Sequence, residues 1–237
     1  MNARVQLLDG FSLTCDGRQV SVPRSAQRLL AFLALHPHPL RRAHVAGSLW
    51  LDSPEERAHA SLRSALWRLQ GAGAEVIEVR AGELLLAPSL RVDHREAALL
   101  ARALLDGRAA GLQAVADWGM LAGELLPDWD EEWVAVEREH HRQLSLQALE
   151  ALSERMLAAG TLPQALAVAL AVFAREPLRE TAHRLMIRVH LADGNTFEAI
   201  RQYHLYERLA LTRIGIRPSP QMRELVSGLV PDELALA

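Results

Sequence analysis

The sequence predicts a mainly α-helical protein with small β-sheets, divided into an N-terminal part and a C-terminal helical repeat. Three observations support this fold class. Apolar residues recur at helical spacing between residues 55 and 70, β-prone runs flank the helices of the first ninety residues, and a pattern with a 34-residue period appears in the second half. We therefore expect two domains, residues 1–90 and 91–237.

The first forty residues combine short strands with one helix. Three runs are β-prone: Val5–Leu8, Phe11–Cys15 and Val20–Val22. Asp16 and Gly17 supply the turn between the last two runs. The segment Arg24–Leu35 has an apolar stripe typical of a helix, and the prolines Pro37 and Pro39 end it.

Two further helices follow, separated by a short turn. The first is Arg41–Trp50 and the second is Glu55–Gln70, and Pro54 between them suits the first turn of a helix but not its interior. Two helices joined in this way form a helix-turn-helix candidate. A hairpin, which in this position is a wing, is indicated by two β-prone runs: Glu75–Val79 and Leu84–Leu86. The first domain is thus predicted to be a winged helix-turn-helix.

The helix Glu55–Gln70 separates into two faces. Its apolar stripe consists of Ala58, Leu62, Ala65, Leu66 and Leu69. A different side bears two arginines and two short hydroxyl residues: Arg57, Ser61, Ser64 and Arg68. Guanidinium groups can bind guanine edges or phosphates in a DNA major groove, and small side chains allow a close approach. The alternative for this helix taken alone is an ordinary solvated face.

The second half contains a repeat. Four residues recur with an offset of 34 positions: Leu157, Ala158, Gly160 and Ala165 match Leu191, Ala192, Gly194 and Ala199. This is the period of tetratricopeptide helix pairs. The predicted helices are Glu132–Ala159, Leu162–Arg175, Glu180–Asp193 and Thr196–Leu211, with Arg95–Asp106 before them and a capping helix at Pro220–Leu229. Gly160 and Gly194 lie where a left-handed residue ends the first helix of each pair.

Both halves resemble one family of regulators. The order of strands, three helices and hairpin, with SLW closing the second helix and LRSALWRLQ the third, resembles the winged helix-turn-helix of OmpR/PhoB-type response regulators. The phrases LLPDWDEEWVAVER, AREPLRETAHRLMIRVHLADGN and GIRPSPQMREL resemble the bacterial transcriptional activator domain of SARP-type antibiotic-regulatory transcription factors. The resemblance covers nearly the whole chain. It implies a sequence-specific DNA-binding transcriptional regulator, an activator that contacts RNA polymerase or other transcription proteins.

The resemblance also implies roles for single residues. Ser64 and Arg68 are expected to face bases, Arg57 and Ser61 to lie near the DNA backbone, and Trp50 to donate its indole N–H to a phosphate. The start of the second helix and the wing are expected to add phosphate contacts. The full predicted set for double-stranded DNA is Arg42, Trp50, Arg57, Ser61, Ser64, Trp67, Arg68 and Arg80.

Three positions of the third helix depart from the response-regulator pattern. Ala60, Trp67 and Gln70 stand where those regulators often have Arg. Fewer phosphate contacts per protomer should follow, so we expect the protein to bind DNA as a homo-oligomer.

Composition gives only modest support for nucleic-acid binding. The formal net charge is −3, and all 26 basic residues other than His are Arg. Residues 1–95 contain 12 Arg and nine acidic residues, whereas residues 96–237 contain 14 Arg and 20 acidic residues. The single cysteine, the lack of a signal-peptide pattern and the lack of a long apolar run predict a cytoplasmic protein with no membrane contact.

Nothing in the sequence indicates an enzyme, a cofactor or a metal. It has no glycine-rich phosphate loop, nucleophile elbow or paired-carboxylate motif. His36, His38 and His44 cluster, but no Cys or carboxylate neighbour completes a ligand set. The alternative function is a tetratricopeptide-type protein-interaction scaffold without DNA binding. In either function a partner could bind the repeats, and the candidate surface residues, for which ordinary solvated or packing roles are the alternative, are Arg184, Arg188, Arg201, Tyr203 and Tyr206.

Overall fold

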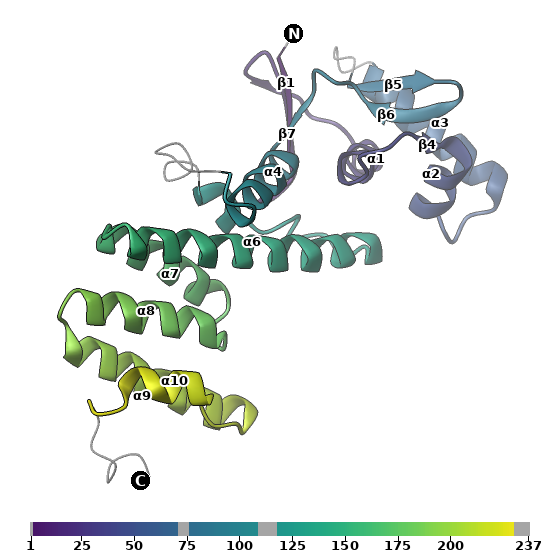
Figure 1. The fold of residues 1–237 in the computed structure, drawn as a ribbon. Coiled ribbons are helices and arrows are strands. Elements are labelled where there is room, and N and C mark those ends of the chain that lie inside the picture. The colour runs from purple at the N-terminus through teal and green to yellow at the C-terminus, as the bar shows by residue number, and fades with distance from the viewer. Residues whose placement is uncertain (1, 71–75, 109–117, 230–237) are drawn as a thin grey trace. The chain divides into compact units, whose positions relative to one another are not determined.

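The computed structural model describes residues 2–70, 76–108 and 118–229. These residues are mainly helical with two small sheets, as predicted (Figure 1). The chain forms two compact units, which we call the first unit (residues 1–99 and 123–142) and the second unit (residues 100–122 and 143–237). Two helices, α4 (Asp93–Leu105) and α6 (Glu132–Ala158), each contribute to both units.

A four-stranded sheet of the first unit has the strand order β3-β2-β1-β7. Its strands are β1 (Ala3–Gln6), β2 (Ser12–Cys15), β3 (Arg18–Gln19) and β7 (Arg91–Val92). The strand predicted at Val20–Val22 is wrong. Asp16 and Gly17 form a two-residue turn with φ of 48° and 77°, which places Arg18 directly opposite Cys15. Strand pairing with β2 therefore starts at Arg18, two residues before Val20, where the β-branched residues had predicted the strand to begin.

Three helices follow as predicted: α1 (Arg24–Leu35), α2 (Arg42–Leu49) and α3 (Glu55–Gln70). The bounds of α1 and α3 agree with the predicted ones because each has a clear apolar stripe. In α3 the buried residues are Ala58, Leu62, Ala65 and Leu69, while Leu66 is only half-buried. The second helix is one residue shorter at each end than predicted, since Arg41 belongs to a strand and Trp50 is the C-cap.

The wing is a three-stranded sheet with the order β4-β6-β5. Its strands are β4 (Leu40–Arg41), β5 (Ile77–Arg80) and β6 (Glu83–Leu86). The hairpin is confirmed, and its turn residues Ala81 and Gly82 have φ of 50° and 83°. The predicted first residue of the hairpin, Glu75, lies outside the described residues. The additional strand β4 was not predicted, because two residues are too few to show an alternating pattern.

Two polar side chains, the buried Asp93 and the half-buried Arg95, attach α4 to the segment after β1 and to α1. The Asp93 carboxylate accepts hydrogen bonds from the backbone N–H groups of Leu7 (2.8 Å) and Leu8 (3.1 Å). Burial raises the pKa of this carboxyl group, and the same hydrogen bonds oppose the rise. The Arg95 guanidinium donates to the last carbonyls of α1, including that of Ala34 at 2.8 Å. These bonds satisfy helix-end carbonyls that have no partner within the helix.

The first part of α6 belongs to the first unit. The Arg138 guanidinium donates to the carbonyls of Leu125, Leu126 and Trp129. At the start of the same helix, the Glu131 carboxylate lies 3.3 Å from Arg24 and 3.0 Å from Arg28, both on α1. The beginning of α6 is therefore held against α1.

The second unit is a helical repeat, as the 34-residue period predicted. It contains the 3₁₀ helix η1 (Trp118–Ala122), the rest of α4 and α6, and α7 (Leu162–Arg175), α8 (Glu180–Ala192), α9 (Thr196–Ile214) and α10 (Pro220–Val226). Gly160 and Gly194 have the same φ of 74° and end the first helix of each pair.

The capping helix covers residues that were expected on the surface. Tyr203 and Tyr206 are only 5% and 2% exposed, in a cluster with Met222 and Val226 of α10. The prediction that these tyrosines contribute to a binding surface is wrong, because the packing of α10 on α9 cannot be read from local periodicity. None of the helices in the described part of the chain is long and apolar enough to cross a membrane.

Candidate nucleic-acid interface

The outer face of α3 presents arginines that have no partner among the described residues. The stripe centred on Leu62 faces the core, so the opposite side of the helix faces solvent. Arg57 and Arg68 are exposed, and within the described residues neither guanidinium forms a hydrogen bond or an ion pair. Both are free to bind an external anion or a hydrogen-bond acceptor.

The two serines of this face differ in environment. Ser61 is half-buried, whereas Ser64 is exposed. The Ser64 hydroxyl donates to the carbonyl of Ala60 at 3.1 Å, one turn earlier. In this arrangement the Ser64 oxygen can still accept a hydrogen bond from outside, for example from a base amino group.

Sequence reasoning missed Arg63. This residue is exposed on α3 and also has no partner within the described residues. It lies about 100° around the helix from Leu62, on the flank opposite to that of Ser61. The predicted side of the helix was the one that combines Ser with Arg. A helical projection of all arginines in α3 shows this third cation as well.

The centre of the exposed face is aromatic. Trp67 is 73% exposed, which is unusual for an indole in a folded domain. It lies with Ala60 and Ser64 on the side directly opposite the buried stripe. The face therefore consists of a tryptophan and two small residues, with arginines on both sides.

The two predicted contacts of α2 lie at its ends. Arg42 is the first residue of the helix and is half-buried. Trp50 is the C-cap, is also half-buried, and its backbone N–H donates to Ala46 at 3.0 Å. The Trp50 side chain lines a groove together with Phe32 and Trp133, so its environment is not that of the α3 face.

The arginines of the wing are paired with carboxylates. Strand register places Glu83 directly between Arg41 and Arg80 across the sheet. Arg80 also makes a close ion pair with Glu78, with Nε 2.8 Å and Nη2 2.6 Å from the same carboxylate oxygen. The contact between Arg41 and Glu83 is longer, at 3.9 Å. Exposed pairs of this kind contribute little free energy, so a phosphate can compete with the carboxylate.

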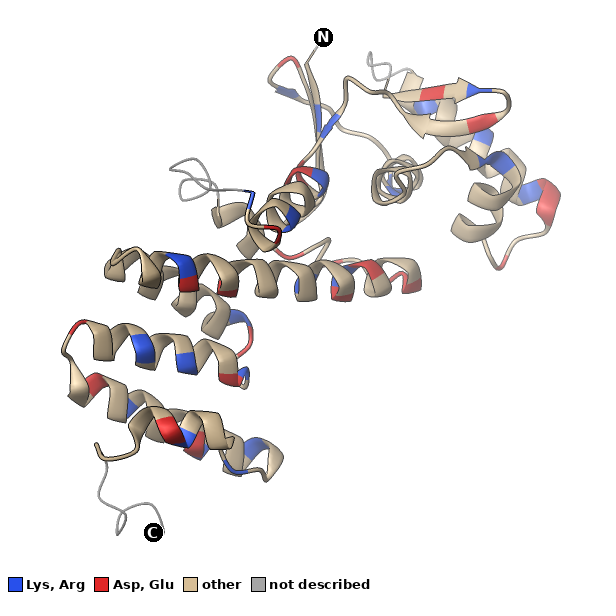
Figure 2. Ribbon diagram, viewed as in Figure 1, with Lys and Arg blue, Asp and Glu red and all other residues tan. Residues whose placement is uncertain are grey.

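Figure 2 shows acidic residues close to basic ones on the wing, and the first turn of α3 contains Glu55 and Glu56. These carboxylates stabilise the N-terminus of the helix. They also explain why the basic excess of the predicted interface is small. In the described part of the chain, no group of three or more His, Cys, Asp and Glu is arranged to hold a metal ion.

Comparison with protein families identifies the second half of the chain. The family model of the bacterial transcriptional activator domain matches residues 89–229. The regulatory protein AfsR of Streptomyces coelicolor is 26% identical over 247 aligned residues, which cover 94% of this chain. AfsR of Streptomyces griseus is 24% identical over 225 residues, covering 91% of the chain. The chain spans only about a quarter of these relatives, 24% and 23% of their lengths.

A solved structure has a similar fold. The chain superposes on Mycobacterium tuberculosis EmbR, solved in complex with a low affinity phosphopeptide, with a TM-score of 0.75. The match covers 97% of this chain and 66% of EmbR, at 22% sequence identity. The likeness therefore extends over both units and concerns the fold.

Proposed function

The chain belongs to the bacterial transcriptional activator domain family as a SARP-type transcriptional regulator, and on this premise we propose that it binds specific double-stranded DNA sequences through α3 and the wing. The observation that supports this best is the outer face of α3. It has three exposed arginines to which the described part of the chain gives no partner, on a helix that follows a helix-turn-helix turn and precedes a wing.

In the proposed complex α3 lies in the major groove. Arg68 binds a base edge, with guanine O6 and N7 as the preferred acceptors, and Ser64 accepts from a base amino group. Trp67 makes apolar contact with a thymine methyl group or with the sugar backbone. Arg57 and Ser61 lie near one strand, and Arg63 lies near the other.

Phosphate contacts position this helix. Arg42 at the start of α2 and Arg80 on the wing bind phosphates on either side of the recognition helix, and the Trp50 indole N–H adds one more. These contacts supply affinity for any sequence, while the α3 face supplies the preference for one sequence.

We further propose that two or more protomers bind directly repeated half-sites. One recognition helix covers few base pairs, and Ala60, Trp67 and Gln70 offer no charge to phosphates. Varying the spacing between two half-sites by single base pairs tests this. Affinity should peak at about 10–11 bp between centres, where both protomers lie on one face of the DNA. Equal affinity for one half-site and for the phased pair would contradict it.

The helical unit is proposed to contact RNA polymerase or other transcription proteins, which makes the regulator an activator that acts in the cytoplasm. DNA binding is the step to test first. About four arginine contacts with phosphates should make the affinity fall with salt at a slope of roughly −4 on a log–log plot. A protein-interaction scaffold without DNA binding would show no salt-dependent affinity for DNA. The absence of such binding would therefore contradict the proposal.

A further inference from the structure

The first unit has an open groove of about 710 Å³, and Trp50 is the one proposed DNA contact among its lining residues. It lies between α1, the end of α2, the turn before α3 and the first turns of α6. Its volume is within the range of sites for small organic molecules. All its lining residues belong to the first unit.

The walls of the groove are aromatic. Phe32 packs edge-on against Trp133, with ring centroids 5.2 Å apart, and Trp50 lines the groove as well. At the rim two aliphatic side chains are largely exposed, Leu51 at 76% and Val136 at 65%. The groove thus offers a flat aromatic surface and an apolar edge that a ligand can cover.

The charged side chains of the lining are mainly carboxylates. Asp52, Glu132 and Glu137 line the groove, and the described residues give them no arginine partner. His36 adds a further acceptor. Its Nδ1 lies 2.7 Å from the carbonyl of Phe32, so Nδ1 bears the hydrogen and Nε2 of the neutral ring is left to accept.

The single arginine of the lining is already engaged. The Nη2 group of Arg28 donates a hydrogen bond to the carbonyl of Leu49 at 2.8 Å. Its Nε lies 3.0 Å from Glu131 Oε1, a contact that counts as an ion pair but does not meet the criteria of a hydrogen bond. With one arginine and four carboxylates, the lining has a formal charge of −3 when histidines are neutral.

A groove of similar size in the second unit, about 680 Å³, shows what is distinctive here. There two of the three lining carboxylates have arginine partners: Glu150 binds Arg179, and Glu154 binds Arg188. Arg184 and Arg188 line the groove as well, so the lining is close to neutral. Of these two grooves, the groove of the first unit is the one that combines aromatic walls with an excess of negative charge.

We propose that the groove of the first unit binds a small organic cation with an apolar body, such as an arylalkylamine. The ammonium group lies among Asp52, Glu132 and Glu137, and the apolar body covers Trp50 and Trp133. Cations are attracted both by carboxylates and by the faces of indole rings. This site does not depend on DNA binding.

The probe is 4-phenylbutylamine, and the matched control ligand is 4-phenylbutyrate, which has a similar apolar body and the opposite charge. Binding to the whole chain is followed through the indole N–H signals in a ¹H–¹⁵N spectrum, with Trp50→Phe and Trp133→Phe used for assignment. The amine should shift these two signals in a saturable way, and the carboxylate should not.

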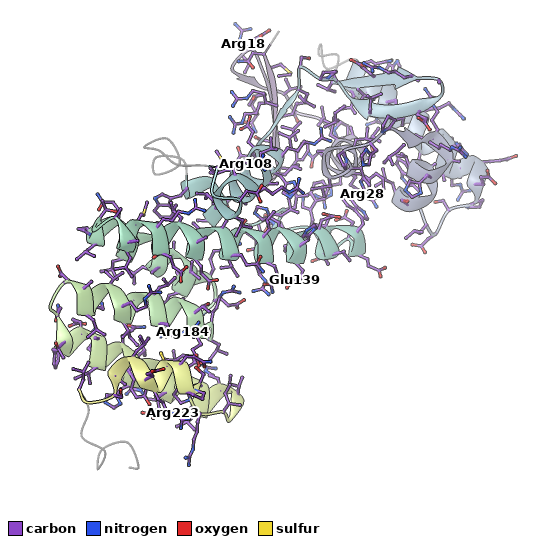
Figure 3. All side chains as sticks on the ribbon, in the orientation of Figure 1. Arg18, Arg28, Arg108, Glu139, Arg184 and Arg223 are labelled. Carbon is purple, nitrogen blue, oxygen red and sulfur yellow. The ribbon has the colours of Figure 1, made fainter. Side chains whose placement is uncertain are left out.

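The charge requirement is tested with the double variant Glu132→Gln/Glu137→Gln, which should weaken amine binding about fivefold. The control is Glu139→Gln, which removes one negative charge from α6 outside the groove and is compared with Glu137→Gln alone as well as with the double variant. Figure 3 labels Glu139, and also Arg28 on α1. Glu139→Gln should leave the affinity unchanged.

Four results overturn the proposal. The first is an amine titration that leaves the signals of Trp50 and Trp133 unchanged, the second is carboxylate binding as tight as that of the amine, and the third is a Glu139→Gln variant that binds the amine as weakly as the double variant does. The fourth is a change of these signals with protein concentration, which identifies a second copy of the chain as the occupant.

Discussion

The arginines of α3 and those of the wing differ in whether they have an ion-pair partner within the described protein. On α3, Arg57, Arg63 and Arg68 have no partner within the described residues. On the wing, Arg80 is bound by Glu78 and lies beside Glu83. A partnerless guanidinium can keep both of its donor edges for a base, whereas a paired one must exchange a carboxylate for a phosphate. The comparison suggests that α3 determines which sequence is bound and the wing tunes how tightly any DNA is bound.

The largest effect is expected from the inner face of α3. Leu62 is fully buried, so Leu62→Ala removes packing and leaves a cavity, which should lower the free energy of unfolding by about 2–5 kcal/mol. Urea unfolding of the variant and the parent measures this. An unchanged urea midpoint would mean that the apolar stripe of α3 does not stabilise the fold. It would also contradict the assignment of the opposite side of α3 as the DNA-binding face.

Arg68→Ala tests the outer face of the same helix. It should cost about 1–3 kcal/mol of binding free energy for a specific site, because a bidentate base contact is lost, and it should not change thermal stability. A gel-shift titration on a site selected from genomic fragments measures the first effect. If the variant binds that site as well as the parent, Arg68 makes no base contact.

Arg80→Ala and Arg42→Ala test the phosphate contacts. Each should weaken binding to all sequences by a similar factor and flatten the salt slope by about one unit. Fluorescence anisotropy at several salt concentrations measures both quantities. A loss confined to the specific site, with the slope unchanged, would move the residue from phosphate to base contact.

The smallest effect, and the only gain, is expected from Glu78→Gln. Releasing Arg80 from its exposed ion pair should tighten DNA binding about 1.4-fold to fivefold, equivalent to the roughly 0.2–1 kcal/mol of such a pair. The same anisotropy titration measures it, with Glu139→Gln as the control for net charge. Equal gains in the two variants would show that only overall charge matters.

Much of the fold could be predicted because its helices are amphipathic. The bounds of α1 and α3 followed from apolar stripes with proline and turn residues at their ends, and the 34-residue repeat placed Gly160 and Gly194. The strands β3, β4 and β7 have two residues each, which is too short for an alternating pattern. Their positions are set by turns and by pairing partners distant in sequence.

The candidate site was predictable to a different extent. The exposed arginines of α3 follow from helix geometry, and even Arg63 could have been found in that way. The pairing of Arg80 with Glu78 could not, because it depends on side-chain conformation in the hairpin. The position of Glu83 between Arg41 and Arg80 depends on a strand, β4, that left no signal in the sequence.

The most direct test of the central claim is the ratio of affinities for the selected site and for a scrambled site of the same length, measured for the parent, Arg68→Ala and Arg80→Ala at one salt concentration. If α3 determines sequence preference and the wing binds phosphate, Arg68→Ala lowers this ratio about fivefold or more, and Arg80→Ala leaves it unchanged while weakening both affinities. Equal ratios in all three proteins, or a ratio that falls only in Arg80→Ala, would contradict the account.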